Sequence, residues 1–332
     1  MSSSRSIILD QLRGSKEPSI QYSVAKFIDK RDPNSEDLRD MQLEIKNSDR
    51  VQALREGLET RHPYSKWQGA HWVLSLLAEL HYPAGDEQLY PLQIQAFDWL
   101  MSKNHLKSIK TINGKVRRCA SQEGNAIYYS QVLGLKDDRI EELVDRIVSF
   151  QWDDGGWNCD KNPNAFNSSY NESLIPFRAL IRYLQDNRNQ LSKSRLNKIE
   201  RSIQNAKEVF LKRELYLSLT TGETIKPQFT LLHFPYYWRY NILFALKVMN
   251  EGGFLFDPRC NKAIDFIESK ELPTGGFPAE KRYYYSKTAQ SGRTAVSWGG
   301  VKKTKLNEWV TSEVFQILNS SNRLKNHSQT EV

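Results

Sequence analysis

Apolar residues recur every third or fourth position along most of the chain, which is the period of an amphipathic helix. Alternating patterns typical of strands are nearly absent. The pattern predicts an N-terminal helical pair over residues 20–29 and 35–47. It then predicts helical hairpins and one closing helix, over residues 65–80 with 88–101, 119–133 with 137–150, 168–183 with 192–212, 235–249 with 258–269, and 307–319.

The connectors between these helices alternate between short and long, and both kinds contain glycine. Gly134 lies in a short connector, whereas Gly155-Gly156 and Gly275-Gly276 lie in long ones. A unit of helix, long glycine loop and helix that recurs about every 40–60 residues indicates stacked helix pairs. Such pairs form either an open solenoid or a closed ring.

The most informative connector is Gln151-Trp-Asp-Asp-Gly-Gly-Trp-Asn-Cys-Asp160. Glycine lets a chain leave a helix and turn back, and a Gln amide can bond to the unpaired groups of neighbouring helix ends. This stretch resembles the QW repeat of squalene and oxidosqualene cyclases. The resemblance implies an all-α fold, a single α/α-toroid of about five to six helical hairpins. We expect an N-terminal helical extension over residues 1–48, the toroid over 49–319 and a disordered polar tail over 320–332.

The composition limits which partners, which compartment and which membrane role we expect. The formal net charge is +8, but the basic residues are spread along the chain, so nucleic acid is not the expected partner. Three cysteines are too few for a disulfide framework and indicate a reducing, cytoplasmic compartment. No apolar run approaches the roughly 20 residues of a membrane span, which leaves peripheral association as the one membrane role.

Four residues with metal-binding side chains fall near the starts of expected inner helices: His71, Cys119, Cys159 and His233. Two thiolates and two imidazoles are a chemically sound zinc set. The set resembles the zinc site of protein prenyltransferase β-subunits, although Asn158-Cys159-Asp160 lacks the Asp two residues before the Cys. The alternative is that the cysteines are inert and the histidines are ordinary core residues.

Other side chains suit a working cavity. Glu123 and Glu172 are candidate acid/base groups, and Cys119 is a candidate catalytic thiolate. Candidate substrate contacts are basic residues for a diphosphate and aromatic residues for an apolar chain: Lys115, Arg117, Arg118, Tyr236, Tyr240 and Trp309. The alternatives are a solvated basic loop and aromatic filling of the core.

The phrases Trp-Gln-Gly-Ala-His-Trp, Gly-Gly-Trp-Asn-Cys-Asp and His-Phe-Pro-Tyr-Tyr-Trp resemble short prenyltransferase-like proteins of the terpenoid cyclase and protein prenyltransferase superfamily. The Asp-x-Asp-Asp acid of the cyclases is absent, because Gln151 stands where its first Asp belongs. The resemblance implies an enzyme that acts on an isoprenoid or other apolar substrate, with zinc as the expected cofactor. Two alternatives stay open: a non-enzymatic binding toroid, and a glycosidase-like α/α-barrel with Glu123 and Glu172 as paired carboxylates.

Overall fold

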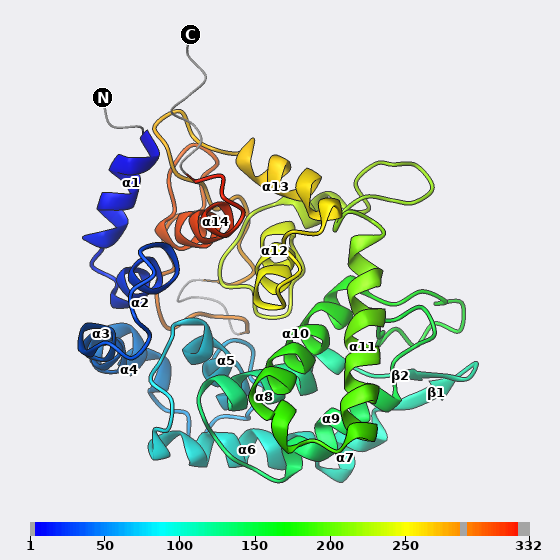
Figure 1. Cartoon of the computed structure of the whole chain (residues 1–332). Coiled ribbons are helices and arrows are strands. Elements are labelled where there is room, and N and C mark those ends of the chain that lie inside the picture. Colours follow the sequence, from blue (N-terminus) through cyan, green and yellow to red (C-terminus); the bar gives the residue numbers. More distant parts are fainter. Residues whose placement is uncertain (1–3, 286–290, 325–332) are drawn as a thin grey trace.

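The chain folds mostly into helices, joined by long irregular connectors and one short β-hairpin (Figure 1). The computed structural model describes residues 4–285 and 291–324. The helices are α1 (Ser4–Arg13), α2 (Pro18–Ser23), the π-helical turn η1 (Val24–Ile28), α3 (Glu36–Asn47), α4 (Asp49–Arg55), α5 (Ala70–Glu79), α6 (Tyr90–Leu100), α7 (Lys103–Lys107), α8 (Ala120–Val132), α9 (Arg139–Ser149), α10 (Tyr170–Asn187), α11 (Lys193–Leu211), α12 (Ile242–Glu251), α13 (Asn261–Glu268) and α14 (Glu308–Ser320). The hairpin pairs β1 (Lys110–Ile112) with β2 (Lys115–Arg117).

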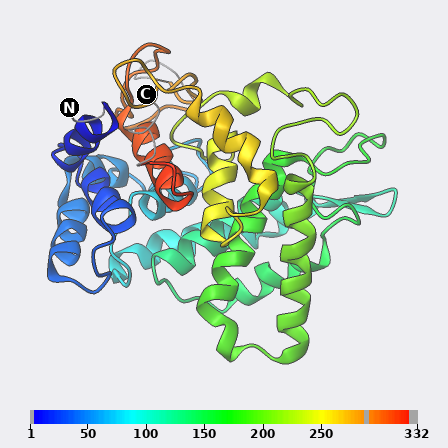
Figure 2. The same cartoon turned by 45° about the horizontal axis from the view of Figure 1, so that its top comes forward.

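Alternate helices form an inner row. In this row α5 packs on α8, α8 on α10, α10 on α12 and α12 on α14, and α14 returns to α2 and η1. The helices α6, α9, α11 and α13 pack on the outside of the row, and Figure 2 shows α10 and α11 side by side. Nearly every residue of α5 and α12 is buried, whereas α9 buries one stripe, Ile140, Leu143, Val144 and Ile147. The inner helices α5 and α12 are therefore apolar on nearly all sides, whereas the outer helix α9 is amphipathic. The inner helices α8 and α10 also bury polar side chains, among them Glu123 and Glu172.

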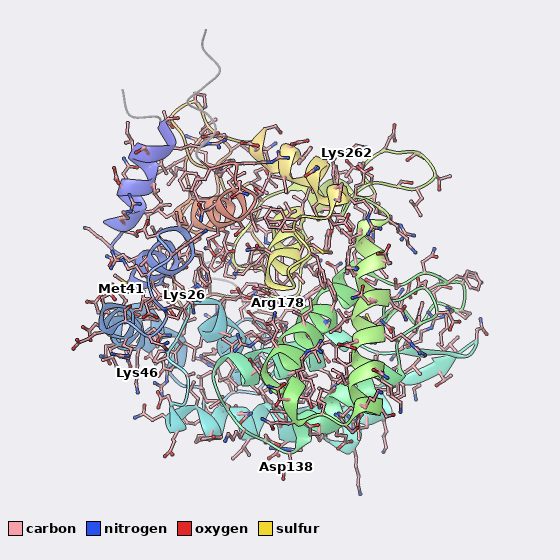
Figure 3. All side chains as sticks on the ribbon, in the orientation of Figure 1. Lys26, Met41, Lys46, Asp138, Arg178 and Lys262 are labelled. Atoms are coloured by element: carbon pink, nitrogen blue, oxygen red, sulfur yellow. The ribbon has the colours of Figure 1, made fainter. Side chains whose placement is uncertain are left out.

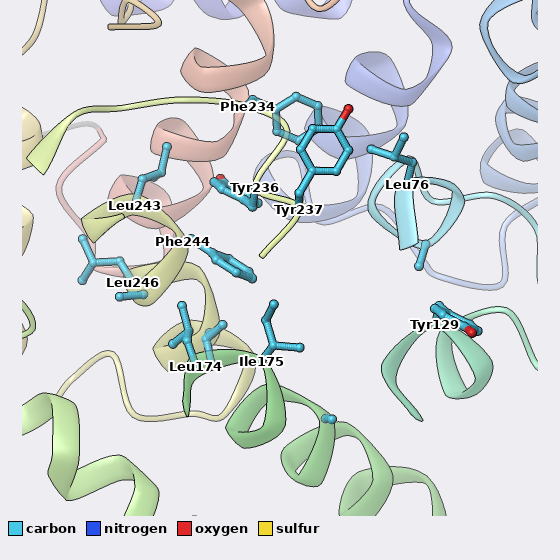
Figure 4. Close-up of a cluster of buried hydrophobic side chains, with 14 of the residues drawn as sticks. Leu76, Tyr129, Leu174, Ile175, Phe234, Tyr236, Tyr237, Leu243, Phe244 and Leu246 are labelled. Carbon is cyan, nitrogen blue, oxygen red and sulfur yellow. The ribbon is translucent and has the colours of Figure 1, made fainter. Parts of the chain in front are cut away.

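Side chains of the inner row meet in a common core. Figure 4 shows Leu76 of α5, Leu174 and Ile175 of α10 and Phe244 of α12 directed toward the same interior. Each is less than 3% exposed. This core holds the inner helices together and fixes where their first turns lie.

The N-terminal helices pack against this body. The Arg5 guanidinium on α1 binds Glu268 and Glu271 at 2.9 and 2.6 Å and donates to the Arg323 carbonyl at 3.1 Å. The division at residue 48 stays a prediction. Of the predicted tail, residues 325–332 lie outside the described residues.

The predicted helix bounds differ most from the structure where an irregular turn precedes the helix. Helix α5 begins at Ala70 rather than at residue 65, because residues 65–69 form a turn in which the Gly69 amide bonds to the Ser65 carbonyl. Helix α12 begins at Ile242, after an irregular segment in which Tyr237 has φ of 51°. The missed hairpin has Asn113 and Gly114 at its turn with φ of 50° and 73°, as a two-residue type I′ turn requires.

Candidate active site at the starts of α8 and α10

Backbone pairing brings two distant cysteines together. Arg117, at the end of β2, forms a parallel bridge with Asn158, and the Arg118 amide donates to the Asn158 carbonyl at 3.1 Å. Cys119 follows Arg118 just before α8, and Cys159 follows Asn158 in the connector after α9. The two thiols are therefore neighbours because their main chains run side by side.

The Gln-Trp connector fixes this pairing to the surrounding helices. The Gln151 amide donates to the Gly155 carbonyl at 2.8 Å and to the Ser202 carbonyl of α11 at 2.9 Å. The indole of Trp152 donates to the Val116 carbonyl of β2 at 2.9 Å. Gly155 has φ of 98°, and a Cβ there would lie 2.4 Å from the Asn205 carbonyl oxygen, so the turn requires glycine.

The same connector positions the first turn of α10. The Ser169 amide donates to the Trp157 carbonyl at 2.8 Å, and the Trp157 amide donates to the Ser173 hydroxyl at 2.9 Å. Helix α10 approaches α8 closely at Gly124, where a Cβ would lie 2.8 Å from the Pro176 nitrogen. Glu172 is thereby held opposite the start of α8.

Cys119, Cys159 and Glu172 form one cluster, the thiol–carboxyl cluster. A ligand atom from each lies within 4.8 Å of the other two. The Ser121 amide donates to Glu172 Oε2 at 3.1 Å, and the Cys159 sulfur lies 3.4 Å from Oε1. Glu172 is 6% exposed, whereas Cys119 is exposed. Among the described residues, no lysine, arginine or histidine forms an ion pair with Glu172.

Burial and the thiol pair shift the acidities of all three groups. Burial raises the pKa of Glu172, since a carboxylate loses its solvation there. The hydrogen bond from Cys159 lowers the pKa of Cys119, and the same bond raises the pKa of Cys159. The cluster therefore combines a proton-holding carboxyl with a thiol that ionises readily.

An open cleft of about 800 Å³ leads to the cluster. Amide and hydroxyl side chains, among them Asn158, Asn171 and Ser168, line it together with the ring of Trp238. Arg213 and Lys226 also line it, and neither forms an ion pair with any residue that the structure describes. Asp154 and Asp160 line it as well, so the cleft is polar and carries charges of both signs.

The two predicted histidines lie outside the cluster. His71 is fully buried among the rings of Tyr64, Trp72 and Tyr129, and burial lowers its pKa to about 3. His233 is 1% exposed, contacts the Pro235 carbonyl oxygen through Nδ1 at 3.2 Å, and has a pKa lowered by burial to about 4. The predicted set of two thiols and two imidazoles is therefore not assembled around one point.

The predicted acid Glu123 and the basic residues lie beside the cluster. Glu123 is fully buried and forms an ion pair with Arg118. Arg117 is 1% exposed, donates to the Ala165 carbonyl at 2.8 Å and stacks on Trp152, and the Lys115 ammonium lies 4.7 Å from the same ring. Arg117 and Arg118 are therefore buried in the scaffold and do not lie on an open rim that could bind a diphosphate.

The three predicted aromatic contacts lie in the core. Tyr236 stacks on Phe244 with ring centroids 4.4 Å apart, and Figure 4 shows both rings in the apolar interior. Tyr240 donates its hydroxyl to the Leu215 carbonyl, and Trp309 stacks on Phe234 at 5.0 Å. None of the three is more than 7% exposed, and none lines the cleft.

Three cleft residues come from the long connector after α11: Arg213, Lys226 and Trp238. Trp238 is the last residue of the His-Phe-Pro-Tyr-Tyr-Trp phrase, whereas Arg213 and Lys226 lie in no local motif, and sequence reasoning missed both. Glu172 was predicted as an acid or base, but its place beside the two thiols follows only from the packing of α8 on α10.

The comparisons with known proteins identify a fold and no family. No family model and no curated protein matches the sequence. A solved structure described as a polysaccharide lyase matches with a TM-score of 0.51, covering 99% of this chain and 100% of its own, at 12% identity. That likeness concerns the fold alone.

These findings correct the predicted function. The prediction of a prenyltransferase- or terpenoid-cyclase-like enzyme acting on an isoprenoid is contradicted by the polysaccharide lyase that shares the fold. The physical reason is visible in the site, since the cleft is polar and the rings expected to hold an apolar chain are packed in the core. Among the described residues, no helix is long and apolar enough to cross a membrane.

Proposed function

We propose that this chain is an α/α-toroid enzyme that cleaves glycosidic bonds of an acidic polysaccharide in the cleft beside Glu172. One observation carries the proposal: an open cleft with amide, hydroxyl and indole side chains ends at a buried carboxyl that forms no ion pair with any cation the structure describes. Sugars are bound by such mixtures of hydrogen-bonding groups and aromatic faces. The fold shared with a polysaccharide lyase supports the same class of substrate.

Two cations of the cleft supply contacts for an anionic group of the substrate, although Asp154 and Asp160 line the cleft too. Arg213 and Lys226 line the cleft without a carboxylate partner among the described residues. Arginine binds a carboxylate through two parallel hydrogen bonds. We assign Arg213 to the carboxylate of a uronic acid unit, where it withdraws negative charge and makes the adjacent C–H more acidic.

The thiol–carboxyl cluster supplies an acid and a base for elimination. The Cys119 thiolate removes the proton from the carbon that bears the substrate carboxylate. The electron pair becomes a carbon–carbon double bond as the neighbouring carbon–oxygen bond breaks, and the Glu172 carboxyl gives its proton to the departing oxygen. The raised pKa of Glu172 and the lowered pKa of Cys119 support this division of roles.

The test is incubation of the purified chain with polygalacturonate, alginate, hyaluronate and neutral dextran. Elimination predicts new ultraviolet absorbance from the conjugated double bond together with one new reducing end per cleavage, and no reaction with dextran. New reducing ends without absorbance would show hydrolysis instead. If none of these polymers, and no further uronate polymer tested, is shortened, the proposed function is wrong.

A second role for the cluster is zinc binding, which the close approach of its three ligand atoms favours. Two thiolates and a carboxylate suit Zn²⁺ and leave one position open to the cleft, as in catalytic zinc sites. A metal there would act as a Lewis acid on a substrate oxygen and would occupy the carboxyl of Glu172. Elemental analysis of protein purified without chelators tests this role, since about one zinc per chain supports it and a stoichiometry near zero excludes it.

A further inference from the structure

A second pocket lies next to the cleft and concentrates positive charge and aromatic rings. It has a volume of about 700 Å³, and its lining includes Lys66, Trp67, Arg239, Lys281, Arg282 and Tyr283. None of these four cations forms an ion pair with a residue that the structure describes. Glu280, the acid in the lining, is already bound to Lys270 at 2.8 Å. The pocket therefore carries an uncompensated positive charge.

Two consecutive residues join this pocket to the cleft. Trp238 lines the cleft, and Arg239 lines the second pocket. The Arg239 guanidinium lies 3.8 Å from the Trp238 ring and 4.8 Å from the Tyr283 ring. A chain that leaves the cleft over Trp238 thus meets Arg239 next.

The Arg239 side chain is held in position but not neutralised. Its Nε is buried and has no hydrogen-bond partner, and burial lowers the pKa of the group. A guanidinium stacked between two rings loses little side-chain entropy on binding and presents its planar edge to an oxyanion. This geometry suits a carboxylate or sulfate group carried on a sugar ring.

We propose that the second pocket is a binding subsite for the anionic groups of an acidic polysaccharide, continuing the cleft past Trp238. This inference rests on the proposed function for the identity of the ligand. Arg239 and Lys281 or Arg282 bind carboxylates of successive units, and the half-buried Tyr283 ring lies beside a sugar face. Nucleic acid is less well suited, because Tyr170 and Phe229 of the cleft and Trp67 and Tyr284 of the second pocket are buried and offer no exposed series of rings on which bases could stack.

The experiment measures binding in a chain that cannot consume its ligand. Glu172→Gln protein is titrated calorimetrically with a galacturonate hexamer and with its methyl ester, which has the same sugars and no charge. Adding Lys281→Glu and Arg282→Glu, both at exposed positions, should weaken binding of the acid at least about tenfold, as expected for one lost charge-assisted contact. Binding of the ester should be weak in every variant.

The matched control adds Lys193→Glu and Lys198→Glu, which make the same charge change on the exposed face at the start of α11. If the control weakens binding as much as the double variant, or the double variant changes nothing, the subsite is wrong. Tighter binding of a single-stranded oligonucleotide than of the hexamer would also overturn it. If the unmodified chain cleaves the polymer but the Lys281→Glu and Arg282→Glu changes do not weaken hexamer binding, only the subsite is wrong. If the hexamer binds and the two changes weaken its binding, but the unmodified chain cleaves no polymer, only the proposed function is wrong.

Discussion

The two ends of the inner helices bury ionisable groups in opposite ways. At their starts, Glu172 lies beside two thiols and has no cationic partner among the described residues. At their other ends, around a cavity of about 520 Å³, Arg178 pairs with Glu79 and Glu251, and Lys247 pairs with Glu79 and Glu313 at 2.8 and 2.7 Å. Figure 3 labels Arg178 among the central helices. Each charge at that end faces an opposite charge.

The difference appears in the acidities of the two carboxyls. Burial alone would raise the pKa of Glu79, but attraction to Arg178 and Lys247 outweighs it and lowers the pKa to about 2. Burial raises the pKa of Glu172, with no ion pair to offset it. Burial therefore does not identify a functional acid by itself. Pairing does not decide it either, since burial raises the pKa of Glu313 although this carboxyl binds Lys247. Glu172 differs by the two thiols and the open cleft beside it, and the following changes test that difference.

The largest expected effect is on catalysis. Glu172→Gln removes the proton donor and should lower the rate of polysaccharide cleavage about 10²- to 10⁴-fold, the usual range for a general acid. Rates are measured with the polymer that the unmodified chain cleaves fastest. Asp160→Asn is the control, because it changes an exposed carboxyl that lines the same cleft and should leave the rate within about twofold of the original. Equal losses in both variants would remove Glu172 from the chemistry.

The next effect is on stability at the other end. Arg178→Met removes a buried guanidinium and leaves the carboxylates of Glu79 and Glu251, whose side chains are 12% and 28% exposed, without their shared partner. It should lower the free energy of unfolding by about 3 kcal/mol or more. Urea denaturation measures it. Arg182→Met breaks an exposed pair with Asp186 one turn along the same helix and should cost about 1 kcal/mol or less. A similar small cost for Arg178→Met would mean that the ion network is not stabilising.

The pH dependence of stability should have opposite signs for the two carboxyls. The folded pKa of Glu79 lies below its unfolded value of 4.5, so its contribution of about 3 kcal/mol is complete above pH 4.5 and is lost as the pH falls toward 2. The folded pKa of Glu172 lies above 4.5, so its contribution is complete below pH 4.5 and is lost as the pH rises through the folded pKa. Unfolding free energies of Glu172→Gln should therefore rise relative to the original chain between pH 4 and 8. A flat difference contradicts the buried, unpaired carboxyl.

The smallest expected effect is a difference in thiol reactivity. Iodoacetamide should modify Cys119 first, because it is exposed and its pKa is lowered by the bond from Cys159. Cys260 is buried, and burial raises its pKa to about 12, so it should react at least about tenfold more slowly. Peptide mass spectrometry over time gives the order. Cys260 reacting as fast as Cys119 would show that the site geometry is wrong.

The sequence predicts the helices well because their periodicity and caps are local. Helices α8, α9 and α11 begin and end within two residues of the predicted bounds. The site is predicted only in part. Cys119 and Cys159 both precede helices and could be selected from sequence, but the bridge between Arg117 and Asn158 that joins them depends on tertiary packing. The histidines were misplaced for the same reason, since nothing near His71 or His233 in sequence reports which neighbours the fold provides.

The bridge between Arg117 and Asn158 has a consequence for redesign. Because main-chain atoms set the distance between positions 119 and 159, that distance does not depend on which side chains the two positions carry. Both cysteines can therefore be replaced, for example by two histidines or by an aspartate and a histidine, without changing the main-chain pairing. The same scaffold could then be given a different chemistry by two substitutions.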